Sequence, residues 1–385
     1  MIGRMAKTLA SLFALALVGV VDAAGQEQQG LPELNREAVR SIVADARRIV
    51  DGRGVEELKE VEIGGIKQWI SVRGRDRRNP ILLFVHGGPG STEMPVSWFY
   101  QSPLEDYFTV VQWDQRGSGK TARSSEPADV VPTITVERMV ADGEELVAHL
   151  RDAYDKEKLF VLGHSWGTVI GLEIARRHPG WLHAYIGMGQ FVYAQGNERV
   201  GYEFALNEAK ARNDDQAISE LEAIAPYPKP DGSLDVREIL TQRKWVIAYG
   251  GLTWGRDNFR YDENLRLLSP DYADSDILAG QNVGTVLVQL LPQLTVLDFW
   301  DVKRLHCPIF LFSGRYDYQT PSQVSADWFK TLEAPEKKIF WFEHSAHMMQ
   351  MEQPGKFFLH LVNDIRPLAE QTGDAAPEDS PGVGQ

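Results

Sequence analysis

The sequence predicts an α/β protein in which helices flank a mostly parallel central sheet and a helical segment is inserted between two parts of the core. Four short runs are almost wholly apolar, as strands buried on both faces are: 81–85, 109–113, 159–162 and 309–312. Helical patterns at 136–150 and 169–177 alternate with these runs, as in an α/β fold. From 193 to 301 the alternation is lost, and helical patterns, prolines and aromatic residues predict a helical lid.

The first residues have the pattern of a secretory signal peptide. Arg4 and Lys7 precede a nearly apolar run, 9–21, which ends before the small residues Ala23 and Ala24. This run is shorter than the roughly 20 residues that a membrane-spanning helix needs. We therefore expect residues 1–23 to be removed and the remaining chain to be exported, to the periplasm or outside the cell, without stable membrane insertion.

The remaining elements follow in order along the chain. An amphipathic helix at 34–50 precedes a hairpin at 60–72, whose Gly64-Gly65 pair suits a tight turn. After the lid we expect a strand at 309–312, a helix at 322–332, a strand at 338–342 and a last helix at 354–365. The predicted parts are a signal peptide 1–23, a first core part 24–192, a lid 193–301, a second core part 302–371 and a disordered tail 372–385.

Composition excludes several classes of protein. The chain has 385 residues, of which 43% are hydrophobic, too many for a disordered protein. Its 40 Lys and Arg against 54 Asp and Glu give a net charge of -14, so nucleic acid and anionic membrane surfaces are not expected partners. Cys307 is the only cysteine, so no internal disulfide forms, and we expect it to be a buried, inert thiol.

A G-x-S-x-G motif carries the first candidate for chemistry. Gly163 to Gly167 directly follows the apolar run 159–162 and directly precedes a helical pattern, the strand-turn-helix context in which this motif exposes a nucleophilic serine. The glycines two positions either side relieve steric clashes at the sharp turn. Ser165 is therefore the predicted nucleophile.

A serine hydroxyl needs a base, and the base needs a carboxylate to orient it, in the chain order Ser, Asp or Glu, His. Asp317 lies just past the end of the strand at 309–312 and is the preferred acid; the competitors are Asp298, Asp301 and Asp327. Among nine histidines, we expect four on helices or helix ends at the surface, namely His149, His178, His183 and His360. His344 and His347, in the loop after strand 338–342, remain, and spacing alone does not separate them.

A second glycine-rich segment, from His86 to Gly90, follows the strand at 81–85. In this architecture such a loop supplies one backbone N–H for the oxyanion, and the residue after the nucleophile supplies the other. The amides of Gly88 and Trp166 are the candidates.

These motifs resemble those of the α/β-hydrolase superfamily and, within it, the prolyl iminopeptidase branch. The matching segments are His86 to Gly90, Asp114 to Thr121, Gly163 to Thr168, Gly314 to Asp317, and His347 with Glu352 and Pro354 behind it. The resemblance implies an α/β-hydrolase fold with an inserted lid (cap) that shapes the substrate pocket. It also implies a triad of Ser165, Asp317 and His347, because the family's histidine is trailed by a Glu and a Pro, which His344 lacks.

The sequence also departs from that branch. Prolyl iminopeptidases have a Trp-Glu pair in the lid that holds the substrate's amino group, but here the lid residues Trp245 and Trp254 are followed by Val246 and Gly255. Possible substitutes are Glu198, Glu203, Glu208 and Glu263, each expected to be a solvated lid residue. His164 stands where the branch often has Gly, and this difference favours esterases and other hydrolases of the superfamily.

The function expected from the sequence is that of an exported serine hydrolase that releases an N-terminal residue, often proline, from short peptides. The chemistry requires no metal and no organic cofactor. One alternative is a lidded carboxylesterase acting on small esters or amides. Another is a binding protein that uses the fold without catalysis, since fold alone does not fix function.

Overall fold

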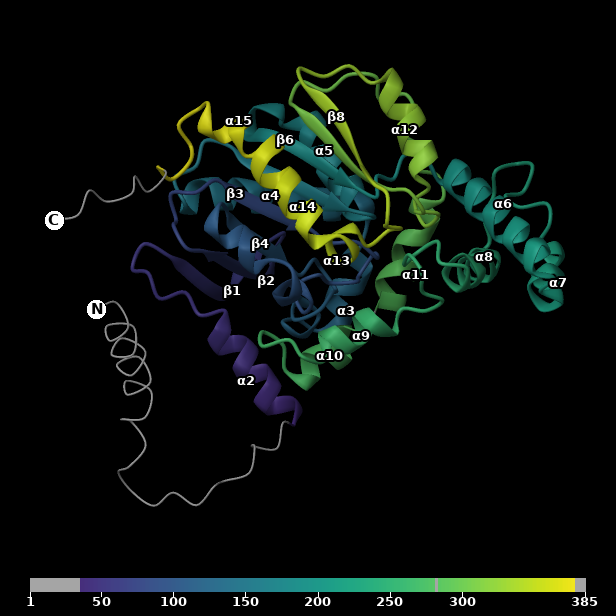
Figure 1. Ribbon diagram of the computed structural model, residues 1–385, viewed down its shortest axis with the longest axis horizontal. Coiled ribbons are helices and arrows are strands. Elements are labelled where there is room, and N and C mark those ends of the chain that lie inside the picture. The colour runs from purple at the N-terminus through teal and green to yellow at the C-terminus, as the bar shows by residue number, and fades with distance from the viewer. Residues whose placement is uncertain (1–34, 281–282, 378–385) are drawn as a thin grey trace, which may run out of the picture. The chain divides into compact units, whose positions relative to one another are not determined.

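A computed structural model describes residues 35–280 and 283–377. By its contacts the chain divides into Met1–Val39 and Arg40–Gln385. Of the first unit only the beginning of helix α2 (Arg36–Ala46) is described, and the predicted signal peptide, 1–23, lies outside the described residues. The second unit contains the sheet and every site discussed below (Figure 1).

An eight-stranded sheet, with the strand order β1-β2-β4-β3-β5-β6-β7-β8, forms the centre of this unit. β1 and β2 are antiparallel, as are β2 and β4, and the remaining neighbours are parallel. The predicted parallel centre is therefore confirmed. The strands are β1 (Val55–Ile63), β2 (Ile66–Gly74), β3 (Ile81–Val85), β4 (Thr109–Trp113), β5 (Leu159–His164), β6 (Leu182–Met188), β7 (Ile309–Gly314) and β8 (Lys337–Phe342).

The predicted hairpin is formed by β1 and β2, joined by Gly64 and Gly65. Ile63 pairs with Ile66, so the loop has two residues, with φ of 57° at Gly64 and 74° at Gly65. Two positive φ values in a two-residue hairpin loop favour glycine. The Gly-Gly pair is what lets the chain reverse at this point.

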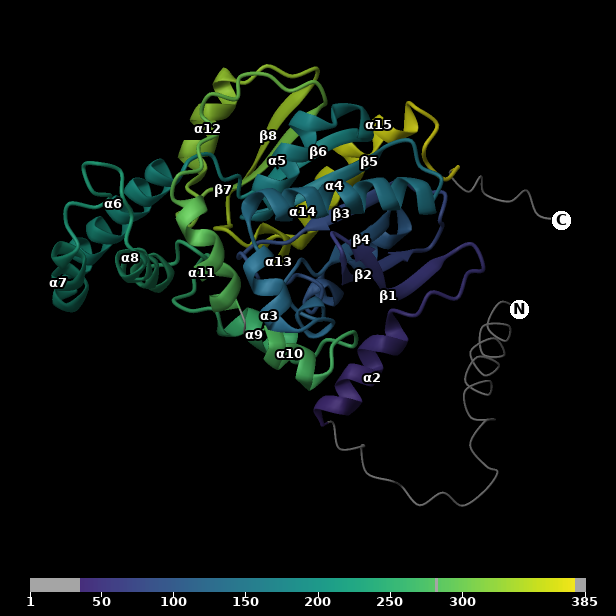
Figure 2. The same cartoon turned by 180° about the vertical axis from the view of Figure 1, so that it is seen from behind.

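Alternate residues of the strands face two apolar layers. Leu83 and Val85 of β3 pack in one cluster with α4 (Val136–Ala153) and α5 (Gly167–Arg177), the helices in front of the sheet in Figure 2. Leu82 and Phe84 pack in the other with α14 (Pro354–His360), in front of the sheet in Figure 1. Because both faces of the sheet are buried, its central strands are apolar at nearly every position.

Helices α6 to α11 occupy the segment between β6 and β7 that was predicted to form a lid. They are α6 (Ala194–Arg212), α7 (Asp215–Ala223), α8 (Val236–Ala248), α9 (Arg260–Arg266), α10 (Asp274–Gly280) and α11 (Val283–Leu294). The first three share a small core of their own, which includes Ala205, Leu221 and Trp245, and they lie beyond the edge of the sheet in both views (Figures 1 and 2).

The end of the chain returns to the sheet. Helix α12 (Ser322–Thr331) connects β7 to β8, and α13 (Met349–Glu352) and α14 follow β8. A π-helical turn, Leu361–Ile365, and α15 (Pro367–Glu370) come last. Within the described ranges no helix combines the length and the apolar character that crossing a membrane requires.

The structure differs from the sequence-based expectations at strand β6 and at His183. Strand β6 was not predicted, because its sequence contains His183, Tyr185 and Gly187 and does not form an apolar run. His183, expected on the surface of a helix, lies on this strand and is buried. Its Nε2 is 2.9 Å from Asp374 Oδ2. Asp374 belongs to the segment predicted to be a disordered tail, of which residues 378–385 lie outside the described ranges.

Candidate active site

Ser165 lies at the sharp turn between β5, which ends at His164, and α5, which begins at Gly167. Its φ of 54° places a non-glycine residue in the left-handed region, a strained conformation that persists only where the surroundings enforce it. A Cβ at Gly163 would come within 2.4 Å of the Gly167 carbonyl oxygen, and one at Gly167 within 2.0 Å of the Val85 carbonyl oxygen. Glycine at 163 therefore lets the turn close, and glycine at 167 lets it pack against β3.

Asp317 and His347 are brought together from loops that follow neighbouring strands, β7 and β8. His347 Nδ1 is 2.8 Å from Asp317 Oδ2, and because a carboxylate only accepts, Nδ1 is the donor. Both residues are buried. Asp317 Oδ1 accepts the backbone N–H groups of Gln319 and Thr320, each at 2.9 Å, so the carboxylate is held in place from both sides.

Ser165 and His347 line the same cavity, of about 110 Å³. No hydrogen bond joins their side chains in the part of the chain that the structure describes. Catalytic hydrogen bonds are often long without substrate. With Nδ1 bonded to Asp317, Nε2 is the nitrogen that remains to accept a proton from Ser165.

The loop from His86 to Gly90 passes close to the serine. A Cβ at Gly87 would lie 2.9 Å from Ser165 Cβ, so only glycine allows this approach. The loop is held by Gln115, whose side-chain amide donates to the His86 carbonyl oxygen at 2.8 Å and accepts from Trp166 Nε1 at 2.9 Å. Burial lowers the pKa of His86 to about 4, so this imidazole is neutral. Gly88 and Trp166, the predicted oxyanion residues, both line a second cavity with Ser165.

The segment from Asp114 to Thr121 holds other elements together. Arg116 forms a buried ion pair with Asp142 of α4, its Nε 2.8 Å from Oδ2, and donates to the Gly64 carbonyl oxygen at the hairpin. Asp114 accepts the backbone N–H of Lys120 at 2.8 Å. Burial raises the pKa of Asp114 to about 7. Arg116 and Asp114 thus support the sheet and its loops, while Gln115 of the same segment holds the loop beside Ser165.

The other candidates for the acid and the base lie away from Ser165. His344, Asp298 and Asp301 are exposed, and Asp327 pairs with Lys330 on α12. His164 Nε2 is 3.0 Å from the His347 carbonyl oxygen, and burial lowers the pKa of His164 well below its ordinary value. It is a neutral neighbour of His347.

Cys307 is buried, which raises its thiol pKa to about 12 and makes it unreactive.

Three residues beside the triad were not predicted from the sequence. Thr320 Oγ1 donates to the Gly189 carbonyl oxygen at 3.0 Å and lies 3.2 Å from His347 Nδ1. A Cβ at Gly189 would lie 2.8 Å from the His347 ring. Gly189 directly follows β6, so the signal for it was lost with that strand. The third residue, Glu93, lines the cavity that contains Ser165 and His347.

Glu352, noted in the sequence only because it trails the histidine, joins the histidine loop to the lid. Its Oε1 accepts the backbone N–H of Trp254 at 2.5 Å, and its Oε2 accepts that of Ala346 at 2.8 Å. The Leu252 carbonyl oxygen also accepts the backbone N–H of His347, at 3.0 Å. Burial raises the pKa of Glu352 to about 7.

The second cavity beside Ser165 has a volume of about 190 Å³ and a largely apolar wall from the lid. Leu240 of α8 and Leu291 of α11 are part of that wall, and Glu198 of α6 is its carboxylate. Glu198 is buried, so the expectation that it is solvated is wrong. It is paired with Arg243 and accepts the Tyr227 hydroxyl at 2.5 Å.

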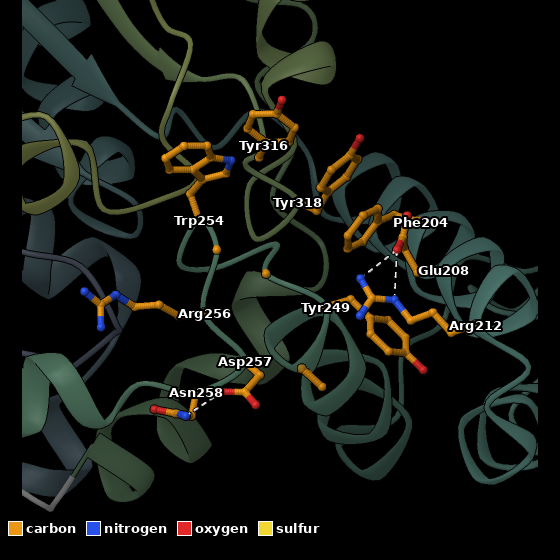
Figure 3. Close-up of a pocket in the computed structure, with 13 residues that line it drawn as sticks. Phe204, Glu208, Arg212, Tyr249, Trp254, Arg256, Asp257, Asn258, Tyr316 and Tyr318 are labelled. Atoms are coloured by element: carbon orange, nitrogen blue, oxygen red, sulfur yellow. Dashed lines mark hydrogen bonds and ion pairs between the residues drawn. The ribbon is translucent and has the colours of Figure 1, made fainter.

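The other three lid glutamates do not line either cavity of Ser165. Glu203 and Glu263 are exposed. Glu208 and its partner Arg212 lie at a larger cavity, of about 650 Å³, which is also lined by Phe204, Tyr249, Trp254, Tyr316 and Tyr318 (Figure 3). Tyr318 stacks on Phe204 with ring centroids 3.7 Å apart. Neither Ser165 nor His347 lines this cavity.

A family model and several known proteins match this chain. The family model for the alpha/beta hydrolase fold matches residues 80–354. A probable aminopeptidase of Bacillus subtilis is 29% identical over 83% of this chain and 99% of its own length. A proline iminopeptidase of Heyndrickxia coagulans is 26% identical over 74% of this chain and 89% of its own.

Solved structures share the fold at lower identity. A proline iminopeptidase of Mycobacterium smegmatis has a TM-score of 0.59 at 18% identity and covers 82% of this chain and 100% of its own. A proline iminopeptidase-related protein from Thermus thermophilus has a TM-score of 0.58 at 22% identity, covering 82% and 98%. The chain therefore belongs to the α/β-hydrolase fold family, and its sequence is similar to an aminopeptidase and a proline iminopeptidase.

Proposed function

We propose that this protein is an exported serine hydrolase that removes the N-terminal residue, often proline, from short peptides. The observation that carries the proposal is the placement of Ser165 and His347 in one cavity, with Asp317 bonded to the far nitrogen of the imidazole. A buried pair of this kind gives the histidine a fixed orientation and stabilises the imidazolium that forms when it takes a proton.

In the proposed reaction Ser165 Oγ attacks the carbonyl carbon of the N-terminal residue while His347 Nε2 takes the hydroxyl proton. The oxyanion of the tetrahedral intermediate accepts hydrogen bonds from the Gly88 and Trp166 amides. The proton then passes to the leaving amine, and the C–N bond breaks. Water, deprotonated by the same imidazole, attacks the acyl-enzyme and releases the free amino acid.

The names of the relatives support a peptide substrate over an ester. The relatives from B. subtilis and H. coagulans are named a probable aminopeptidase and a proline iminopeptidase. The apolar cavity of about 190 Å³ beside Ser165 favours the second candidate, a lidded carboxylesterase, because an acyl chain would be buried there.

Export is part of the proposal because of the charged and apolar pattern at residues 1–23. A fusion of residues 1–30 to a reporter enzyme that is active only after export would test it. Activity with the native segment, and loss of it when charged residues replace the apolar run 9–21, are expected. Equal reporter activity with and without the segment contradicts export.

The function is tested with the chain lacking residues 1–23, assayed on prolyl and alanyl p-nitroanilides and on p-nitrophenyl acetate and butyrate. Anilide cleavage is expected, and Ser165→Ala should reduce all turnover by about 10⁴-fold or more. Ester cleavage alone, lost with Ser165, favours the carboxylesterase. Undiminished turnover by the folded Ser165→Ala variant contradicts the proposed nucleophile.

A fluorophosphonate probe separates an enzyme from a non-catalytic binding protein. The probe reacts with serine hydroxyls that a neighbouring base activates. Labelling of the wild type that is absent in Ser165→Ala is the expected result. A folded wild type that does not label indicates a binding protein.

A further inference from the structure

The small cavity beside Ser165 contains a carboxyl group that the triad does not use. Glu93 lines this cavity of about 110 Å³ together with Ser165 and His347. It follows the glycine-rich loop that ends at Gly90, and only 3% of its surface is exposed. A buried carboxylate is expensive unless a cation or several hydrogen bonds compensate it.

Glu93 has little compensation from the protein. Its Oε1 accepts a hydrogen bond from Gln350 Nε2 at 3.1 Å, and the Tyr100 hydroxyl is another polar neighbour. Across the described residues no Lys, Arg or His forms an ion pair with it. Arg266 lines the same cavity, but its guanidinium is paired with Asp262 and donates to the Thr92 carbonyl oxygen. The positive charge of Arg266 is thus already neutralised by another carboxylate.

Glu198, which lines the other cavity at Ser165, differs from Glu93 because its carboxylate has a cationic partner. Its carboxylate oxygens are taken by Arg243 and by the Tyr227 hydroxyl. A cationic ligand would have to compete with that guanidinium. Of the two carboxyl groups in the cavities at Ser165, only Glu93 lacks a cation as partner.

We propose that the Glu93 carboxylate binds the protonated α-amino group of the substrate residue whose carbonyl carbon Ser165 attacks. The inference rests on the proposed function. In an aminoacyl substrate a single carbon separates the amino group from the scissile carbonyl, so the group that receives the ammonium must line the same cavity as Ser165 Oγ. Glu93 does so.

The chemistry of Glu93 agrees with this role. Burial raises its pKa to about 7, so near neutral pH the empty site holds a carboxyl group that ionises readily when a cation arrives. An ammonium beside it forms a charge-assisted hydrogen bond and supplies the counter-charge that the protein does not. A substrate without the amino group leaves the carboxyl buried and unpaired, and so loses affinity in the transition state.

The test compares alanyl p-nitroanilide with propionyl p-nitroanilide, which has hydrogen in place of the amino group. Wild-type kcat/KM should favour the alanyl substrate by about 100-fold or more, and in Glu93→Gln this ratio should fall to within about 5-fold of one. Glu198→Gln is the matched control, because it alters the carboxylate of the other cavity, and it should retain the wild-type ratio.

Each outcome has a distinct meaning. If the wild type prefers the alanyl substrate and Glu93→Gln keeps that preference, Glu93 is not the receptor; loss of the preference in Glu198→Gln instead assigns the role to Glu198. A wild type that cleaves neither anilide but hydrolyses esters overturns the proposed function, and this inference with it. Should Glu93→Gln not fold, Glu93→Asp replaces it, and a ratio reduced by less than about 10-fold contradicts the assignment.

Discussion

His347 Nδ1 lies 2.8 Å from Asp317 Oδ2, and the two residues are carried by the loops after β8 and β7, which are adjacent parallel strands. Their proximity is therefore built into the sheet, because the carboxyl ends of parallel neighbours open at one edge. The backbone N–H groups of Gln319 and Thr320 hold the other carboxylate oxygen. The pair is fixed before any substrate arrives.

Replacing Asp317 with Asn should lower kcat by about 10³ to 10⁴-fold. Asn retains an oxygen for the backbone N–H groups, but its amide cannot accept from Nδ1–H in the same orientation, so the imidazole adopts the wrong tautomer. Steady-state kinetics on p-nitrophenyl acetate measure the loss. Asp327→Asn, on the exposed side of α12, is the control and should keep wild-type kcat; an equal loss there would show that the effect is not specific to the triad.

Replacing Glu352 with Gln should lower kcat. The carboxylate accepts one backbone N–H from the lid loop and one from the histidine loop, and Gln keeps only one acceptor oxygen. The loop that carries His347 is then less firmly held, and we expect steady-state kinetics to show kcat reduced about 10-fold. Glu343→Gln, which alters an exposed carboxylate paired with Arg315, should keep wild-type kcat, and wild-type kcat in Glu352→Gln contradicts the role.

Replacing Gly314 with Ala should separate the two catalytic loops. A Cβ at this position would come within 1.8 Å of the Ala346 carbonyl oxygen, next to His347. The backbone must move, at a cost of about 1–3 kcal/mol or more, and the Asp317 to His347 geometry moves with it. Thermal melting and kcat should both fall. Gly180→Ala is the control, because no atom lies within 4 Å of its added Cβ; similar melting of the two variants would refute the crowding.

The pH dependence of stability should reveal the raised pKa of Glu93. Burial raises its folded-state pKa from about 4.5 to about 7, so between these values the folded protein holds the proton more firmly than the unfolded chain. Stability contributed by this group is present at low pH and is lost as pH rises through 7. The groups around it are Gln350, Tyr100, Asp262 and Arg266.

Glu93→Gln removes that titration. Relative to wild type the variant should be more stable at pH 8, by on the order of 3 kcal/mol, and nearly equal to it at pH 5. Urea unfolding at the two pH values measures the difference. A stability difference that is the same at pH 5 and pH 8 contradicts the raised pKa.

The sequence by itself predicted the alternation of strands and helices, the hairpin at Gly64-Gly65 and the motif around Ser165. These signals are local: a strand buried on both faces must be apolar throughout, and a turn with positive φ favours glycine. β6 could not be predicted in this way because it contains the polar residue His183. This side chain is buried and bonded to Asp374, which is distant in the sequence. With β6 the signal for Gly189, against which His347 packs, was lost as well.

The tertiary structure decided everything that depends on which distant side chains meet. His344 and His347 are equivalent by spacing, but one is exposed and the other is buried against Asp317. The sequence predicts that Glu198 is a solvated lid residue and gives no signal for Glu93, yet the fold buries both beside Ser165 and pairs only Glu198 with a cation. Periodicity reports the environment of a residue on its own helix or strand, whereas charge compensation in a cavity depends on elements far apart in the chain, and only their packing determines it.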